Sequence, residues 1–165
     1  MEIEYMKVPL YRYTFKPIKM KKWIESNCYG YVLNLFAGKT KLNINEVRND
    51  IDKTMMAEYH KDALDFVKEW NEKKFDTIIL DPPYSYRKSM EMYNKKMNSR
   101  FKQVKDILPS IMNKGIVITF GYHSISMGEI RGFKQEKILL MYHGGAIHDT
   151  IAVVESKLQL SSLED

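Results

Sequence analysis

Cysteine is nearly absent from this sequence: Cys28 is the only one among 165 residues. A single cysteine excludes an intramolecular disulfide and argues against a metal centre built on cysteine. Histidine is also scarce, and the four histidines, His60, His123, His143 and His148, are too scattered to have the spacing of metal ligands. We therefore expect no metal ion.

Long apolar runs are missing as well. No stretch approaches the roughly 20 residues that span a bilayer, and the segment Met1–Leu10 carries Glu2, Glu4 and Lys7 in place of the apolar centre of a signal peptide. The apolar fraction of 44% and the charged fraction of 28% are typical of a soluble globular protein. We expect a cytoplasmic protein with no membrane partner.

The length fits one domain with a sizeable core. We find no internal repeat, low-complexity tract or linker in the sequence. We expect a single domain over 1–165, with a basic segment and a helix in 1–30, the core in 31–157 and a tail in 158–165.

The net charge of +5 is modest, and its distribution is more informative. One basic segment comprises Arg12, Lys16, Lys19, Lys21 and Lys22, and another comprises Arg87, Lys88, Lys95, Lys96, Arg100, Lys102 and Lys105 with Glu91 as its one acid. Such segments suit a polyanionic partner, although a solvated lysine face on a helix would look the same. We expect nucleic-acid phosphates to be held by Arg87, Lys88, Lys95 and Lys96.

Predicted strands and helices alternate, which indicates a parallel sheet covered by helices. We expect helices at 17–27, 62–73, 87–113 and 124–131, and strands at 31–36, 46–51, 75–80, 115–120, 135–142 and 146–156. The last two strands are joined at His143-Gly144-Gly145, a connection typical of an antiparallel hairpin. The expected fold is therefore α/β in three layers, with a mostly parallel sheet and a C-terminal antiparallel hairpin.

Candidate functional residues follow four of the predicted strands. They are Phe36-Ala37-Gly38, Asp50 with Asp52, Asp81-Pro82-Pro83-Tyr84, and Gly121-Tyr122-His123. Ligands of such sheets bind beyond the carboxyl ends of the strands. We expect these four groups to border one site.

The group Asp81-Pro82-Pro83-Tyr84 directly follows the apolar run 75–80. Proline lacks an N–H and disfavours helical geometry in the preceding residue, so this corner offers hydrogen-bond acceptors. The Asp81 carboxylate and the Pro82 carbonyl could accept both N–H bonds of a primary amine, which would free the nitrogen lone pair to attack a methyl sulfonium. Tyr84 could stack on the ring of a base, worth about 1–3 kcal/mol. The pattern predicts methylation of an amino nitrogen on a nucleic-acid base; the alternative is that the prolines merely end a strand.

Over roughly 13–156 the chain resembles the S-adenosylmethionine-dependent amino-methyltransferases of the DNA adenine-N6 and cytosine-N4 type. Asp-Pro-Pro-Tyr is similar to the adenine-N6 version of their catalytic motif. The resemblance implies a Rossmann-like class I methyltransferase fold, S-adenosylmethionine as the cofactor and adenine N6 of DNA as the favoured acceptor. It makes Asp81, Pro82 and Tyr84 the expected catalytic residues.

The same resemblance implies several cofactor-binding residues. Leu33–Gly38 resembles the cofactor loop, which gives Phe36, Ala37 and Gly38, although Thr40 stands where the family has a second glycine and few residues remain for a following helix. A nucleotide P-loop at Gly38-Lys39-Thr40 is disfavoured because position 33 is leucine.

Further cofactor contacts come from three other places. Thr14, Lys16 and Pro17 resemble a family segment that opens a helix facing the cofactor carboxylate, although a basic turn that opens an amphipathic helix would look the same. Asp62 resembles an acid that accepts from the cofactor adenine, with an ordinary helix N-cap as the alternative. Acids after the second strand commonly bind ribose hydroxyls, and Asp50 and Asp52 would share one face of an extended strand; a polar turn is the alternative there.

On the acceptor side we expect Pro83, Tyr122 and His123 beside the base, although His123 could equally be a surface loop residue. The chain has no segment long enough for a target-recognition domain. A separate specificity subunit or a homodimer could supply recognition. Because base flipping is easiest in single-stranded sites, an amino group in ribosomal or transfer RNA is an alternative acceptor. A third hypothesis, a non-catalytic nucleic-acid-binding subunit, is disfavoured by the intact motif at 81–84.

Overall fold

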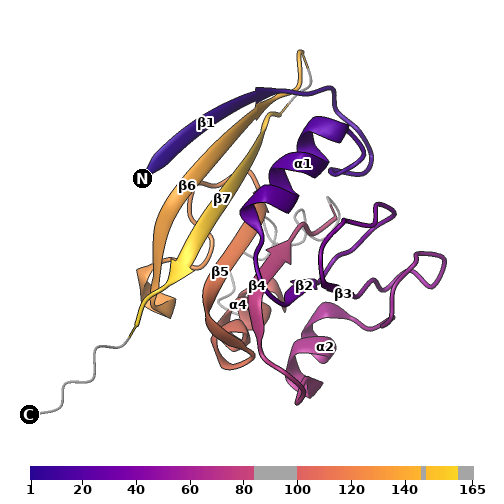
Figure 1. The fold of residues 1–165 in the computed structure, drawn as a ribbon, viewed down its shortest axis with the longest axis vertical. Helices are drawn as coiled ribbons and strands as arrows, with labels where there is room; N and C mark the ends of the chain where they lie inside the picture. The colour runs from indigo at the N-terminus through magenta and orange to yellow at the C-terminus, as the bar shows by residue number, and fades with distance from the viewer. Residues whose placement is uncertain (84–99, 146–147, 160–165) are drawn as a thin grey trace, which may run out of the picture.

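The structure is a computed structural model that describes residues 1–83, 100–145 and 148–159. Within these residues, seven strands form one sheet in the order β1-β6-β7-β5-β4-β2-β3 (Figure 1). The strands are β1 (Glu2–Lys7), β2 (Val32–Asn34), β3 (Glu46–Arg48), β4 (Phe75–Leu80), β5 (Met112–Gly121), β6 (Phe133–Tyr142) and β7 (Thr150–Lys157). The helices are α1 (Ile18–Asn27), α2 (Ala63–Glu69) and α4 (Arg100–Ile107), with 3-10 turns η1 (Leu108–Ser110) and η2 (Glu129–Arg131).

The sheet is mostly parallel, as predicted. Strand β2 pairs in parallel with β3 and β4, β4 with β5, and β1 with β6. Strand β7 alone runs antiparallel, to both β5 and β6. The C-terminal hairpin of β6 and β7 is therefore confirmed.

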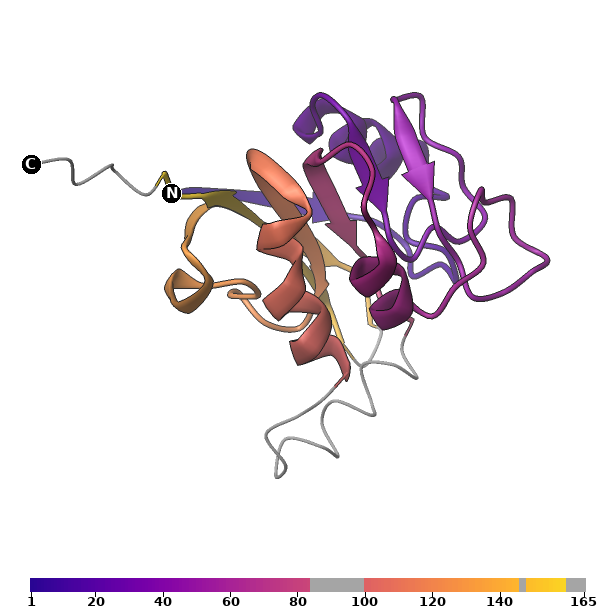
Figure 2. The same cartoon turned by 90° about the horizontal axis from the view of Figure 1, so that it is seen from below.

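Helices cover both faces of the sheet, which gives the three predicted layers. Helix α1 packs Met20, Trp23 and Ile24 against one face, in a core that includes Phe120. On the other face, α2 and α4 bury a second core, and Figure 2 shows these two helices side by side. Phe101, Val104, Leu108 and Ile111 are all buried in this second core. Residues 87–99 of the predicted helix 87–113 lie outside the described residues.

Strand β3 is shorter than predicted. It ends at Arg48 because the following residue, Asn49, instead makes an isolated bridge to Tyr59, whose backbone returns beside it. Asp50 and Asp52 therefore lie in a turn, and the prediction that they share the face of a strand is wrong. Their contact with a cofactor ribose stays a prediction.

Two other elements are shorter than predicted, each for a local reason. Helix α2 ends at Glu69 because Trp70 turns into an extended conformation and packs its ring 4.8 Å from the ring of Phe75. The predicted helix 124–131 is only the 3-10 turn η2. Gly128 has a φ of 69°, outside helical geometry, and the buried Glu155 takes the N–H groups of 126–128.

The edge strand β1 was not predicted. It lies parallel to β6, in register from Glu2 opposite Lys137 to Lys7 opposite Tyr142. Glu4 fixes it to the neighbouring elements, because its carboxylate accepts hydrogen bonds from Lys137 at 2.9 Å and from the indole of Trp23. The N-terminal segment therefore enters the cavity region from the far edge of the sheet.

Candidate active site

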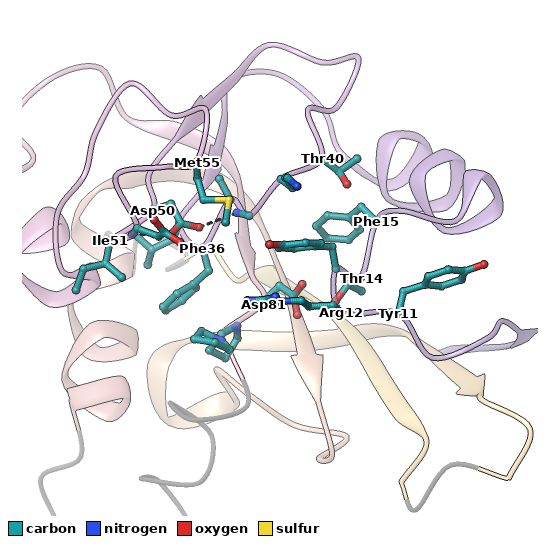
Figure 3. Close-up of a pocket in the computed structure, with 18 of the residues that line it drawn as sticks. Tyr11, Arg12, Thr14, Phe15, Phe36, Thr40, Asp50, Ile51, Met55 and Asp81 are labelled. Atoms are coloured by element: carbon teal, nitrogen blue, oxygen red, sulfur yellow. Dashed lines mark hydrogen bonds between the residues drawn. The ribbon is translucent and has the colours of Figure 1, made fainter.

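A large cavity of about 1190 Å³ opens at the carboxyl ends of the parallel strands. All four groups of residues that follow the predicted strands contribute to its lining: Phe36, Ala37, Gly38, Asp50, Asp52, Asp81, Pro82, Pro83 and Tyr122. Figure 3 shows the stretch from Tyr11 to Phe15 along one side, Asp50, Ile51 and Met55 along the other, and Asp81 between them. Pockets for a small-molecule ligand usually measure about 300–1,000 Å³. The cavity is therefore large enough for a ligand of cofactor size.

The corner after β4 is placed by a rigid strand. Ile78, Ile79 and Leu80 are fully buried, so the position of Asp81 is fixed by the core. Asp81 is half-buried, Pro82 is buried and Pro83 is exposed, and all three line the cavity. Tyr84 lies outside the described residues, so its stacking on a base stays a prediction.

The predicted cofactor loop follows β2 and makes a tight turn. Gly38 has a φ of 60°, which favours glycine. Its N–H donates to Oδ2 of Asp50 at 2.8 Å, and the Ala37 N–H donates to the carbonyl of Asn49 at 2.9 Å. These bonds hold the loop against the turn that follows β3, so the two predicted cofactor segments form one wall.

The turn after β3 carries two aspartates whose carboxylates have different partners. Asp50 Oδ1 accepts the N–H of Asp52 at 2.9 Å, in addition to its bond from Gly38. The exposed Asp52 accepts from both the N–H and the hydroxyl of Thr54, and these bonds lower the pKa of Asp52. Both residues line the cavity.

Asp62 has the N-cap role that the sequence left as an alternative. Its Oδ1 accepts from the N–H groups of Leu64 and Asp65 at the start of α2 and from Arg100 at 2.6 Å. Burial alone would raise the pKa of Asp62, but the bonds from Arg100 and Leu64 outweigh it and lower the pKa. Asp62 also lines the cavity, and its contact with a cofactor stays a prediction.

The predicted N-terminal segment is only partly at the cavity. Thr14 lines it, together with its neighbours from Leu10 to Phe15. Lys16 is exposed and places its Nζ 5.3 Å from the centre of the Tyr11 ring. Pro17 precedes α1 and borders a smaller adjoining pocket of about 30 Å³. Neither residue lines the large cavity.

Of the residues predicted to lie beside the acceptor base, only some line the cavity. Tyr122 lines the cavity, with its ring 5.2 Å from that of His148 between centroids. His123 is exposed and does not line it, which fits its surface-loop alternative. The four predicted phosphate contacts, Arg87, Lys88, Lys95 and Lys96, lie outside the described residues.

Sequence reasoning missed several lining residues, among them Arg12, Tyr13, Asn49, Lys61 and His148. His148 precedes β7, and because β7 is antiparallel it begins where β5 ends. The hairpin prediction could therefore have placed His148 at this edge. Nothing in the local sequence of Arg12 or Tyr13 indicates that the segment folds back over Gly38, where a Cβ would lie 3.4 Å from the Tyr13 ring.

Among the described residues, no group of three His, Cys, Asp or Glu side chains is arranged to hold a metal ion. The same residues include no helix with the length and apolar character needed to cross a membrane.

No protein-family model matches the sequence, and no curated protein matches it. Solved structures do match the fold. The candidate methylase HI0767 of Haemophilus influenzae superposes with a TM-score of 0.54 at 15% identity, over 86% of this chain and 88% of that one. The N-methyltransferase NodS of Bradyrhizobium japonicum gives 0.54 at 11% identity, over 82% and 90%.

TrmN of Thermus thermophilus gives a TM-score of 0.53 at 14% identity, over 78% of this chain and 44% of the other. At such identities the likeness concerns the fold. The chain has a Rossmann-like methyltransferase fold, as predicted.

Proposed function

We propose that this chain is an S-adenosylmethionine-dependent methyltransferase that acts on an exocyclic amino group of a nucleic-acid base, with adenine N6 of DNA as the favoured acceptor. The observation that carries the proposal is that Asp81-Pro82 and the Gly38 loop line one cavity. The corner that would bind the amine and the loop that would bind the methyl donor therefore border the same cavity.

The cavity residues fit the cofactor. The turn at Gly38 permits close approach to a ligand, and the carboxylates of Asp50 and Asp52 suit the hydroxyls of a ribose. Phe36 and Ile51 offer apolar surface on the same wall. The structure of NodS with S-adenosyl-L-homocysteine, at a TM-score of 0.54, gives the same fold with such a ligand. S-adenosylmethionine supplies an activated methyl group, so no metal is required.

The chemistry assigned to this chain is orientation of the amine. The Asp81 carboxylate accepts one N–H of the base and the Pro82 carbonyl accepts the other, which directs the nitrogen lone pair at the methyl carbon. As the new C–N bond forms and the C–S bond breaks, positive charge develops on the nitrogen. Asp81 stabilises that charge and can take up the proton that is released.

RNA is a second candidate acceptor, favoured by one observation. Between the Gly38 loop and Asp81, the described residues form only β3, the turn at 50–58, α2 and β4. These elements include no inserted domain that could recognise a duplex, so a base that is already unpaired would be the easier substrate.

The test is incubation of the purified chain with methyl-labelled S-adenosylmethionine and separate pools of DNA, RNA and protein, followed by identification of the modified nucleoside. We expect label in N6-methyladenine of DNA. Label confined to RNA would move the assignment to the second candidate. Label confined to protein, or no label despite tight binding of the cofactor product, would refute a nucleic-acid methyltransferase.

A further inference from the structure

Arg48, the last residue of β3, has a buried guanidinium with only 2% of the residue exposed. Burying such a charge is costly unless it is fully paired. Nε donates to the carbonyl of Met56 at 2.8 Å. Nη1 donates to the carbonyl of Thr40 at 2.8 Å and to the carboxylate of Glu46 at 2.9 Å. Nη2 donates to the carbonyls of Gly38 at 2.8 Å and Ala37 at 3.4 Å. All five N–H groups are engaged.

Four of these five bonds go to backbone carbonyls in two segments beside the cavity. Three carbonyls belong to the predicted cofactor loop, and the fourth belongs to Met56, next to the cavity-lining Met55. Arg48 itself is not among the lining residues. It therefore connects the two segments of this wall through their backbone carbonyls, from a position outside the cavity lining.

The partner carboxylate strengthens this arrangement. Glu46 lies two residues earlier on β3, with its side chain 1% exposed. Its Oε1 also accepts the N–H of Leu42 at 3.0 Å, and its Oε2 accepts from Asn34 at 3.2 Å. The ion pair thus holds the start and the end of the segment 37–42, which has no helix of its own to satisfy its carbonyls.

The carbonyl directions also set the N–H directions. In a planar trans peptide the C=O of one residue and the N–H of the next point opposite ways. With the Gly38 carbonyl turned toward Arg48, the Lys39 N–H points away from it, and Lys39 lines the cavity. Among the residues that the structure describes, no acceptor takes this N–H.

We infer that Arg48 is a positioning residue for cofactor binding, an inference that rests on the proposed function. Its guanidinium draws the carbonyls of 37, 38 and 40 inward and leaves the opposite side of the loop to the cofactor. Lysine cannot replace it, because an ammonium places three donors at one point whereas the guanidinium spreads five over a planar fork.

The test compares Arg48→Lys with a control of similar burial away from the cavity. Glu155 is 1% exposed and accepts from the N–H groups of Met127 and Gly128 at 2.8 and 2.9 Å. Glu155→Gln should lower the melting temperature and leave cofactor binding unchanged. Arg48→Lys should raise the KM for S-adenosylmethionine and the Kd for S-adenosylhomocysteine by on the order of tenfold, with kcat nearly constant, because uniform binding is lost.

The outcomes separate the inference from the function it rests on. Wild-type protein that neither binds S-adenosylhomocysteine nor transfers methyl groups refutes the proposed function. Wild-type protein that binds it, alongside a folded Arg48→Lys that binds equally well, overturns the inference. The inference is also overturned if Glu155→Gln loses affinity for S-adenosylhomocysteine in proportion to its loss of stability.

If Arg48→Lys does not fold, the inference can still be tested on the wild-type chain. The Arg48 Nε–H should give a slowly exchanging nitrogen-15 NMR signal that shifts when S-adenosylhomocysteine is added. A signal that does not respond to a saturating ligand would overturn the inference.

Discussion

The N–H of Gly38 donates to the carboxylate of Asp50 across 2.8 Å, so the loop after β2 and the turn after β3 are joined at the cavity wall. The same carboxylate also accepts the N–H of Asp52. Asp50 therefore shapes both segments, whereas within the described part of the chain Asp52 accepts only from Thr54 in its own turn.

This difference predicts unequal effects of two matched substitutions. Asp50→Asn keeps one acceptor oxygen and places an NH2 group against a backbone N–H, so it should weaken S-adenosylhomocysteine binding by on the order of tenfold. Asp52→Asn removes the same charge without disturbing the Gly38 loop and should cost about threefold or less. Isothermal titration calorimetry measures both. Equal losses would mean that charge, and not the shape of the loop, determines affinity.

Asp81 should be needed for methyl transfer and dispensable for cofactor binding. Asp81→Ala removes the acceptor that orients the amine, and we expect kcat to fall by at least about 100-fold. The Kd for S-adenosylhomocysteine should stay near its wild-type value, because the cofactor lies on the Gly38 side. Asp65→Ala, on the exposed side of α2, controls for the loss of an aspartate. Parallel loss of activity and binding in Asp81→Ala would assign Asp81 a structural role.

The segment at 87–105 should carry the contacts with nucleic-acid phosphates. Replacing Lys95 and Lys96 together with alanine should weaken binding and reduce the slope of log K against log salt by about 1–2, since each released counterion contributes about one. Lys19 and Lys22, exposed on α1, provide the matched double variant. Filter binding at several salt concentrations measures the slope. If only the α1 variant flattens it, the interface lies on the other face.

Lys105 should make stability depend on pH in the alkaline range. Burial, and then the charge of Arg131, lower the pKa of Lys105 to about 8, against the attraction of Glu155 and Asp106. Its Nζ donates to the carbonyl of Ser126 and lies over the Phe101 ring. The unfolded chain keeps the ordinary lysine pKa near 10.4, so between about pH 8 and 10.4 the unfolded state binds more protons. This residue therefore contributes stability that increases as pH rises through that window.

The measurement is the free energy of unfolding in urea at about pH 7.5, 9 and 10 for wild type and Lys105→Met. The difference between the two should change with pH in the stated direction, because the variant lacks the titrating group. Lys68→Met on α2 controls for removal of one positive charge. A wild-type-minus-variant difference that is flat across the range would mean that Lys105 titrates normally.

Much of the site could be predicted from local patterns. The apolar run that ends at Leu80 and the prolines after it predicted the end of β4. Because ligands of such sheets bind beyond the carboxyl ends of the strands, the four groups of candidate residues were then expected at one edge of the sheet. Where the chain returns on itself, local patterns failed. The strand expected to reach Ile51 ends at Arg48 because Tyr59 lies beside Asn49, a contact between residues that no periodicity connects.

Arg48 shows the same limit for function. In the sequence it is one more charged residue between acids on a short strand. Its role depends on carbonyls at 37, 38, 40 and 56 that only the tertiary fold brings together. A residue that acts through backbone atoms leaves no motif, because carbonyls are common to every residue type.

The parallel pairing of β1 with β6 has a consequence for biosynthesis. Glu2 finds its partner only at Lys137, so on the ribosome the first strand must wait until β6 has emerged. The stretch that follows it, Leu10 to Phe15, completes the cavity. Chains that stop before β6 therefore lack the pairing that holds β1 in place, and this wall of the cavity is left unfinished in them.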